Sequence, residues 1–220
     1  MNKIATTATA LIAAHLLAGC GSNPPAPDWQ MNARSALERA TAAYLSGKDG
    51  VETSEFTRAR EQIGSTGKID LAIRAELARC AARVASLVFE ACPGFDKLAS
   101  DATSTDAAYA AYLAGSLPPG DAARLPEQHR AVAGAGSESA ASAAVLTITD
   151  PLSRLVAAGA VFRANRATPD VLKSAVDTAS AQGWRRPLLA WLSVQAQRAD
   201  QAGDAAEAAR LRRRIALASE

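Results

Sequence analysis

Two segments near the C-terminal end of the chain repeat the same helical pattern at an offset of 36 residues. Pro151 aligns with Pro187, and proline is favoured in the first turn of a helix. In the same register Thr168 aligns with Asp204, and both residue types cap helix N-termini. The apolar positions of the two segments also align: Leu152 with Leu188, Leu155 with Trp191, Val156 with Leu192, Ala160 with Ala196, Ala175 with Leu211 and Ala179 with Ile215. The pattern predicts a duplicated helical hairpin.

The repeat length resembles that of tetratricopeptide repeats, which span about 34 residues. Small or turn-forming residues stand where that family places them: Ala196, Gly203, Asp204 and Ala208. Arg212 and Leu172 depart from the family pattern. The resemblance covers residues 150–217 well and 30–64 loosely, and it implies stacked helical hairpins, because one such unit buries its apolar face only against a neighbour.

The rest of the chain also has helical patterns. One apolar face recurs at spacings of four and three residues: Ile73, Leu77, Cys80, Val84 and Leu87. The first expected helix is capped by Asp28 or Asn32 and runs to about 46, and the third carries the face at 73–87 and ends near 88. The others lie at about 52–63, 105–114, 126–132, 151–165, 169–182, 187–201 and 204–217. The segment 145–149 has strand propensity, but it lacks a partner strand and is predicted to be a helix end.

These patterns predict an all-α fold of antiparallel helical hairpins, stacked as a short tetratricopeptide-like solenoid or an irregular bundle. Aromatic residues make up only 5% of the chain, so alanine, leucine and valine must fill the core. We expect one helical domain over 30–220. It has an N-terminal half at about 30–115, a connection rich in proline, glycine, alanine and serine at about 116–142, and two hairpins at about 150–217.

The N-terminal segment begins with Lys3 and continues without a charged residue from Ile4 to Ala18. This apolar run is shorter than the roughly 20 residues of a membrane span, and its layout is typical of a secretory signal. It ends in Leu17-Ala18-Gly19-Cys20, which resembles the lipobox of bacterial prolipoproteins. The resemblance implies that residues 1–19 are cleaved and that Cys20 is lipidated.

Two or three acyl chains give a stable membrane anchor, whereas one does not. Residues 20–29 then form a tether rich in proline, glycine and serine. No aspartate directly follows Cys20, which, by resemblance to Gram-negative lipoproteins, favours the outer membrane and a domain that faces the periplasm.

Cys80 and Cys92 are the other two cysteines. Beyond the inner membrane thiols meet an oxidising compartment, so we expect them to pair. In one continuous helix their Cα atoms would be roughly 18 Å apart, too far for a disulfide. The helix must therefore end near Val88, and the chain must fold back over the face that holds Cys80.

The sequence contains no recognisable catalytic or metal-binding motif. Two sulfurs without a nearby histidine do not complete a zinc site, and no serine lies in a Gly-x-Ser-x-Gly motif. His129, the only histidine left after cleavage, is interpreted as an isolated surface residue. We therefore expect no cofactor, no metal and no enzyme activity.

Two clusters could form a binding surface. Trp184, Arg185 and Arg186 lie at a junction between helices, where stacking or anion capture is possible; alternatively, Trp184 closes the core between repeats. Arg210, Arg213 and Arg214 make the end of the last helix basic, either as a solvated face or as a contact for an acidic partner. The formal net charge of +2 argues against nucleic acid as a partner.

The sequence thus favours a lipid-anchored protein that acts as an interaction or scaffold module for an unknown envelope protein. The alternative is an envelope enzyme or ligand-binding lipoprotein that acts on cell-wall or lipid material. A polar pocket between the two halves would favour this alternative, and an open concave repeat surface would favour the scaffold.

Overall fold

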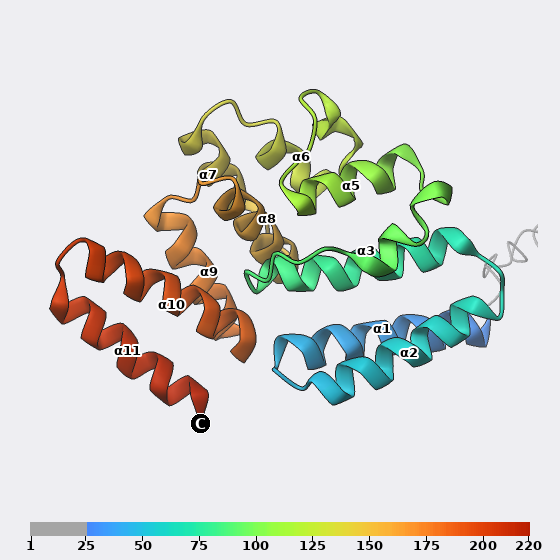
Figure 1. The fold of residues 1–220 in the computed structure, drawn as a ribbon, viewed down its shortest axis with the longest axis horizontal. Helices are drawn as coiled ribbons and strands as arrows, with labels where there is room; N and C mark the ends of the chain where they lie inside the picture. Colours follow the sequence, from blue (N-terminus) through green and yellow to red (C-terminus); the bar gives the residue numbers. More distant parts are fainter. Residues whose placement is uncertain (1–25) are drawn as a thin grey trace, which may run out of the picture.

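The computed structural model describes residues 26–220, all of whose regular elements are helices (Figure 1). The all-α prediction is confirmed for this part of the chain. The predicted signal peptide and Cys20 lie outside the described residues. The α-helices are α1 (Asp28–Leu45), α2 (Asp49–Gly64), α3 (Ile69–Ala85), α4 (Pro93–Asp96), α5 (Ser104–Ala114), α6 (Glu127–Ala133), α7 (Glu138–Thr147), α8 (Pro151–Arg163), α9 (Pro169–Ala181), α10 (Arg185–Gln201) and α11 (Ala205–Ser219), with 3₁₀ turns η1 (Ala99–Asp101) and η2 (Asp121–Arg124).

Helices α1 and α2 form an antiparallel hairpin whose inner side is mostly alanine. Ala36 and Ala59 are fully buried there, and such small side chains let two helix backbones approach closely. A partly buried ion pair joins this hairpin to α3: Glu52 accepts two hydrogen bonds from Arg79, at 2.6 and 3.0 Å. Because this pair is bidentate, it fixes the orientation of α2 on α3 as well as the distance between them.

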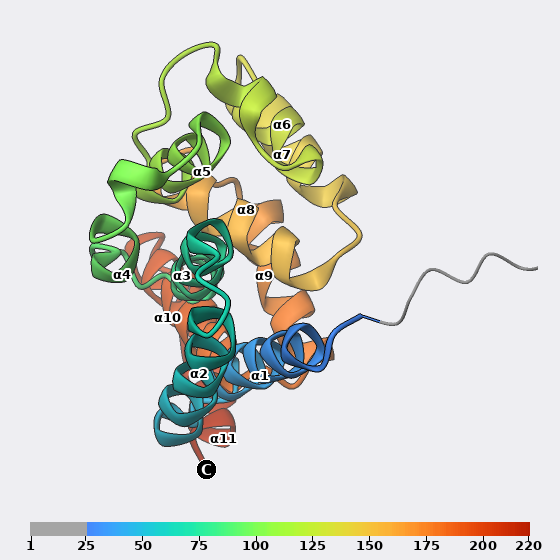
Figure 2. The same ribbon diagram turned by 90° about the vertical axis from the view of Figure 1, so that its right-hand side faces the viewer.

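Helix α3 is the central element of the domain. It packs against α1 and α2 on one side and against α5 and α8 on the other (Figures 1 and 2). Its predicted apolar face is buried, with Ile73 and Val84 among the core residues. The helix ends at Ala85, and Leu87 then takes a positive φ of 58°, which reverses the chain.

The segment 116–142 is more ordered than the sequence suggested. It contains η2, all of α6 and the first half of α7. Ser137 caps α7 by accepting a hydrogen bond from the Ala140 amide. Helix α7 ends at Thr147, so the strand-like stretch after Val145 is a helix end, as predicted.

The last four helices form the two predicted hairpins, α8–α9 and α10–α11. The predicted caps Thr168 and Asp204 are confirmed: each accepts a hydrogen bond from the amide three residues further along, and Asp150 caps α8 in the same way. The exception is α10, which begins at Arg185 instead of Pro187. Proline is tolerated there because the first-turn amides of a helix have no intrahelical acceptor.

Candidate functional site

The inner face of the two hairpins, where a repeat array would have an open concave surface, is filled by the end of α3. Gly159 of α8 lies against Val84, and a Cβ at Gly159 would overlap the Val84 carbonyl oxygen. Trp191 of α10 is fully buried and donates a hydrogen bond from Nε1 to the Ala85 carbonyl oxygen at 3.0 Å. This face is therefore not available to a partner.

The junction at Trp184 is also used within the chain. Trp184 is half-buried and packs on the cluster of Tyr44, Leu45 and Ala82. Arg186 lies 4.4 Å from the centre of the Tyr44 ring, donates to the Tyr44 carbonyl oxygen at 2.7 Å and pairs with Asp49. The prediction that Arg186 is free to bind an anion is therefore wrong. Its guanidinium joins the last two hairpins to the first.

The remaining arginines of the predicted binding surface are spread over two places. Arg185 is exposed beside Gly47. Arg210 forms an ion pair with Glu207 along α11, whereas Arg213 is exposed and Arg214 is half-buried beside the groove between α9 and α11. Their charges do not converge on one point, and acidic side chains share the rim of that groove.

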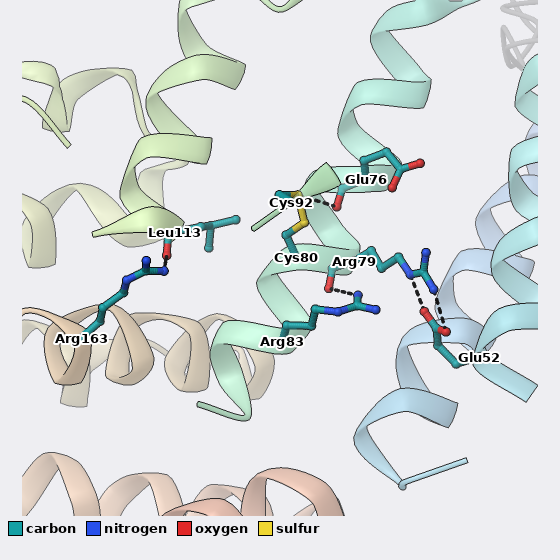
Figure 3. Close-up of a disulfide and its surroundings, with 8 residues drawn as sticks. All are labelled: Glu52, Glu76, Arg79, Cys80, Arg83, Cys92, Leu113 and Arg163. Atoms are coloured by element: carbon teal, nitrogen blue, oxygen red, sulfur yellow. Dashed lines mark hydrogen bonds and ion pairs between the residues drawn. A yellow bond between two sulfur atoms is a disulfide. The ribbon is translucent and has the colours of Figure 1, made fainter. Parts of the chain in front are cut away.

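The predicted cysteine pair is present: a disulfide joins Cys80 of α3 to Cys92, with Cα atoms 6.0 Å apart (Figure 3). The chain reverses after Ala85, as the pairing requires. Nearby, Gly94 packs so closely on Glu76 that a Cβ would overlap the carboxylate. The disulfide therefore fixes the segment 86–92 against the same helix whose end fills the inner face.

A groove of about 610 Å³ lies between the two halves of the domain. Its floor is apolar and includes the buried Leu77, Ala81 and Val156. Its walls come from α1, α3, α5 and the start of α8. Exposed lining residues, including Arg74 and Thr105, show that it opens to solvent. We call this surface the central groove.

Among the described residues, the one carboxylate that lines the central groove is engaged within the fold. Asp106 is buried and belongs to the capping box of α5, where its carboxylate accepts hydrogen bonds from the amide and hydroxyl of Thr103 at 3.1 and 2.6 Å. Tyr109 lines the wall, and burial raises the pKa of its hydroxyl far above the usual value. No pair of titratable side chains in the groove is arranged as an acid and a base.

His129 lies behind Tyr109 and corrects the expectation of a surface histidine. It is 1% exposed, and its ring centre is 5.8 Å from that of Tyr109 and 5.2 Å from that of Tyr112. The Tyr112 hydroxyl is 3.5 Å from Nδ1. Burial lowers the pKa of His129 to about 4, although the charge of Asp150 opposes this shift. The neutral ring is part of the core.

Within residues 26–220, no group of three or more His, Cys, Asp or Glu side chains could hold a metal ion. Over the same residues no helix is both long and apolar enough to cross a membrane. Comparison with family models, curated proteins and solved structures finds no match for this chain.

No pattern in the sequence indicates the central groove. Its lining comes from residues between Thr41 and Val156, and only the packing of α3 between the two halves brings them together. Tyr109 lies on a helix that the sequence predicts, but nothing in its local pattern indicates that it lines a groove.

Proposed function

We propose that this chain is a lipid-anchored protein of the outer membrane that faces the periplasm and holds an envelope protein by direct contact. The lipobox-like sequence at Cys20 supports the anchor. The central groove supports the contact, because its floor is apolar and the one carboxylate in its described lining is already bonded. This observation carries the proposal.

The groove has an apolar floor and a polar rim, which is the usual composition of a protein interface. Arg74 is its one basic lining residue, and the carboxylate of Asp106 is already bonded to Thr103. A neutral, apolar segment of a partner protein therefore fits the groove better than a charged substrate. An enzyme of the envelope would need titratable groups that converge, and the groove does not offer them.

Crosslinking in intact cells tests this contact. A photoreactive amino acid at Ala78 or Thr105 in the full-length protein should give a protein adduct of one defined mass. Both positions line the groove. The matched control is Thr57 on α2, which is exposed and outside the groove. Equal adducts at all three positions, or none at the groove positions, would contradict the proposal.

The anchor has a separate test. Cells fed labelled palmitate should label the wild-type chain, and Cys20→Ser should remove the label and release the protein from the membrane fraction. A wild-type chain of unchanged mass, with the signal peptide still present, would rule the anchor out.

One observation favours a second candidate, a lipoprotein that binds an apolar small ligand. The groove volume lies within the usual range of small-molecule sites, about 300–1,000 Å³, and the Tyr109 hydroxyl makes no hydrogen bond to another described residue. Native mass spectrometry of the membrane-extracted protein distinguishes the two. A bound small molecule that Ala78→Trp displaces would favour the ligand carrier.

A further inference from the structure

We propose that one end of the domain rests on the lipid headgroups and so fixes its orientation on the membrane. This end is formed by Trp29, Met31, Lys68 and Ile69, and we call it the tether end. The inference rests on the proposed lipid anchor and adds a second, non-covalent contact with the same membrane.

Chain length places the tether end near the membrane. Asp28, the first residue of α1, lies eight positions after Cys20, with seven residues between them. At roughly 3.6 Å per position this stretch spans at most about 29 Å when fully extended. The start of α1 and the connection between α2 and α3 lie at the same end of the molecule (Figures 1 and 2). No other end of the domain is tied so closely to the anchor.

The side chains at this end suit a membrane interface. Trp29 is half-buried, and the Lys68 Nζ lies 5.1 Å from the centre of its ring. Tryptophan is enriched at the headgroup level of membranes, and lysine reaches from apolar surface into water. Met31 is 49% exposed and Ile69 41% exposed. Contact with the interface would remove the exposed apolar surface of Met31 and Ile69 from water, which is favourable.

The charges at the tether end indicate how it would bind. Lys68 is basic, but Asp28 and Asp70 are acidic and also exposed. The end therefore has no excess of positive charge to attract anionic lipid. We expect the contact to depend on apolar insertion and to be insensitive to salt, because screening weakens only charge–charge attraction.

Tryptophan quenching in vesicles tests this orientation. The full-length lipidated protein is reconstituted into vesicles of phosphatidylethanolamine and phosphatidylglycerol, with or without bromine on the acyl chains close to the headgroups. We expect lower tryptophan fluorescence in the brominated vesicles. Trp29→Phe should abolish this difference, and replacement of Met31 and Ile69 by glutamine should reduce it.

Trp184→Phe is the matched control. Trp184 packs near Leu45, about 24 Å along α1 from Trp29 at 1.5 Å per residue, and should stay away from the lipid. If the acylated protein floats with the vesicles but quenching is absent, or survives Trp29→Phe, the orientation is overturned and the anchor stands. An intact mass without acyl chains on Cys20 overturns the anchor and the orientation together.

Discussion

The indole of Trp191 on α10 hydrogen-bonds to the carbonyl of Ala85, the last residue of α3, although 106 residues separate them. The bond is buried and marks the place where the end of α3 meets both C-terminal hairpins. Phe162 of α8 adds an edge-on contact, with ring centres 5.7 Å apart. The two halves of the domain are joined here.

Trp191→Phe should lower the free energy of unfolding by about 2–3 kcal/mol, because it leaves a buried carbonyl unpaired and a small void. Urea denaturation followed by circular dichroism measures the change. Trp184→Phe, at a half-buried site without such a bond, should cost clearly less. Equal costs at the two positions would contradict the role given to the bond.

Gly159→Ala should destabilise the protein even though alanine is the better helix former. The new methyl group would overlap the Val84 carbonyl, and forced separation of packed helices costs about 1–3 kcal/mol. Gly50→Ala on α2 is the control: no atom lies within 4 Å of its Cβ position, so the variant should gain up to about 1 kcal/mol. Thermal unfolding of both variants should show shifts of opposite sign.

His129 should make stability depend on pH. Its pKa is about 4 when folded, below the ordinary value of 6.5, so the unfolded chain binds more protons between these values. Stability should therefore be full above about pH 6.5 and should fall as the pH drops toward 4, by at most about 1.4 kcal/mol per pH unit. His129→Phe should flatten this part of the profile. Denaturation curves at several pH values measure the free energy of unfolding. If His129→Phe leaves its dependence on pH unchanged, other groups cause that dependence.

Replacement of both Cys80 and Cys92 by alanine should cost about 3 kcal/mol, since the disulfide closes a short loop in the unfolded chain. Reduction of the wild type should lower its melting temperature to about that of the double variant. Reduction should leave the melting temperature of the double variant unchanged. Peptide mapping without reductant should recover the two cysteines in one linked peptide. Alkylation of both thiols in the protein isolated without reductant would refute the pairing.

Local features of the fold could be predicted from the sequence, as the helix caps show. Thr168 and Asp204 each bond an amide three residues away, so the residue type and the next few positions decide the outcome. The start of α10 could not be predicted in this way. Arg186 is held by Tyr44 and Asp49, which lie more than 130 residues earlier in the chain, and no local pattern reports such a contact.

His129 shows the same limit on a smaller scale. It lies between the charged Glu127 and Arg130, a polar setting that favours the surface. Helix α6 has only seven residues, too few to show a clear apolar face. Its position beneath Tyr109 and Tyr112 turns His129 inward. The central groove was unpredictable for a related reason, since it exists only where four elements meet.

The end of α3 fills the inner face of the two hairpins, and this packing also limits how the domain can change in length. In an ordinary repeat array a hairpin can be gained or lost at either end with little effect on the others. Here a hairpin inserted before α8 would displace Val84 from Gly159, and one inserted between α9 and α10 would pull Trp191 away from Ala85. An additional hairpin after α11 would break neither contact, and Leu217 near the end of α11 is exposed.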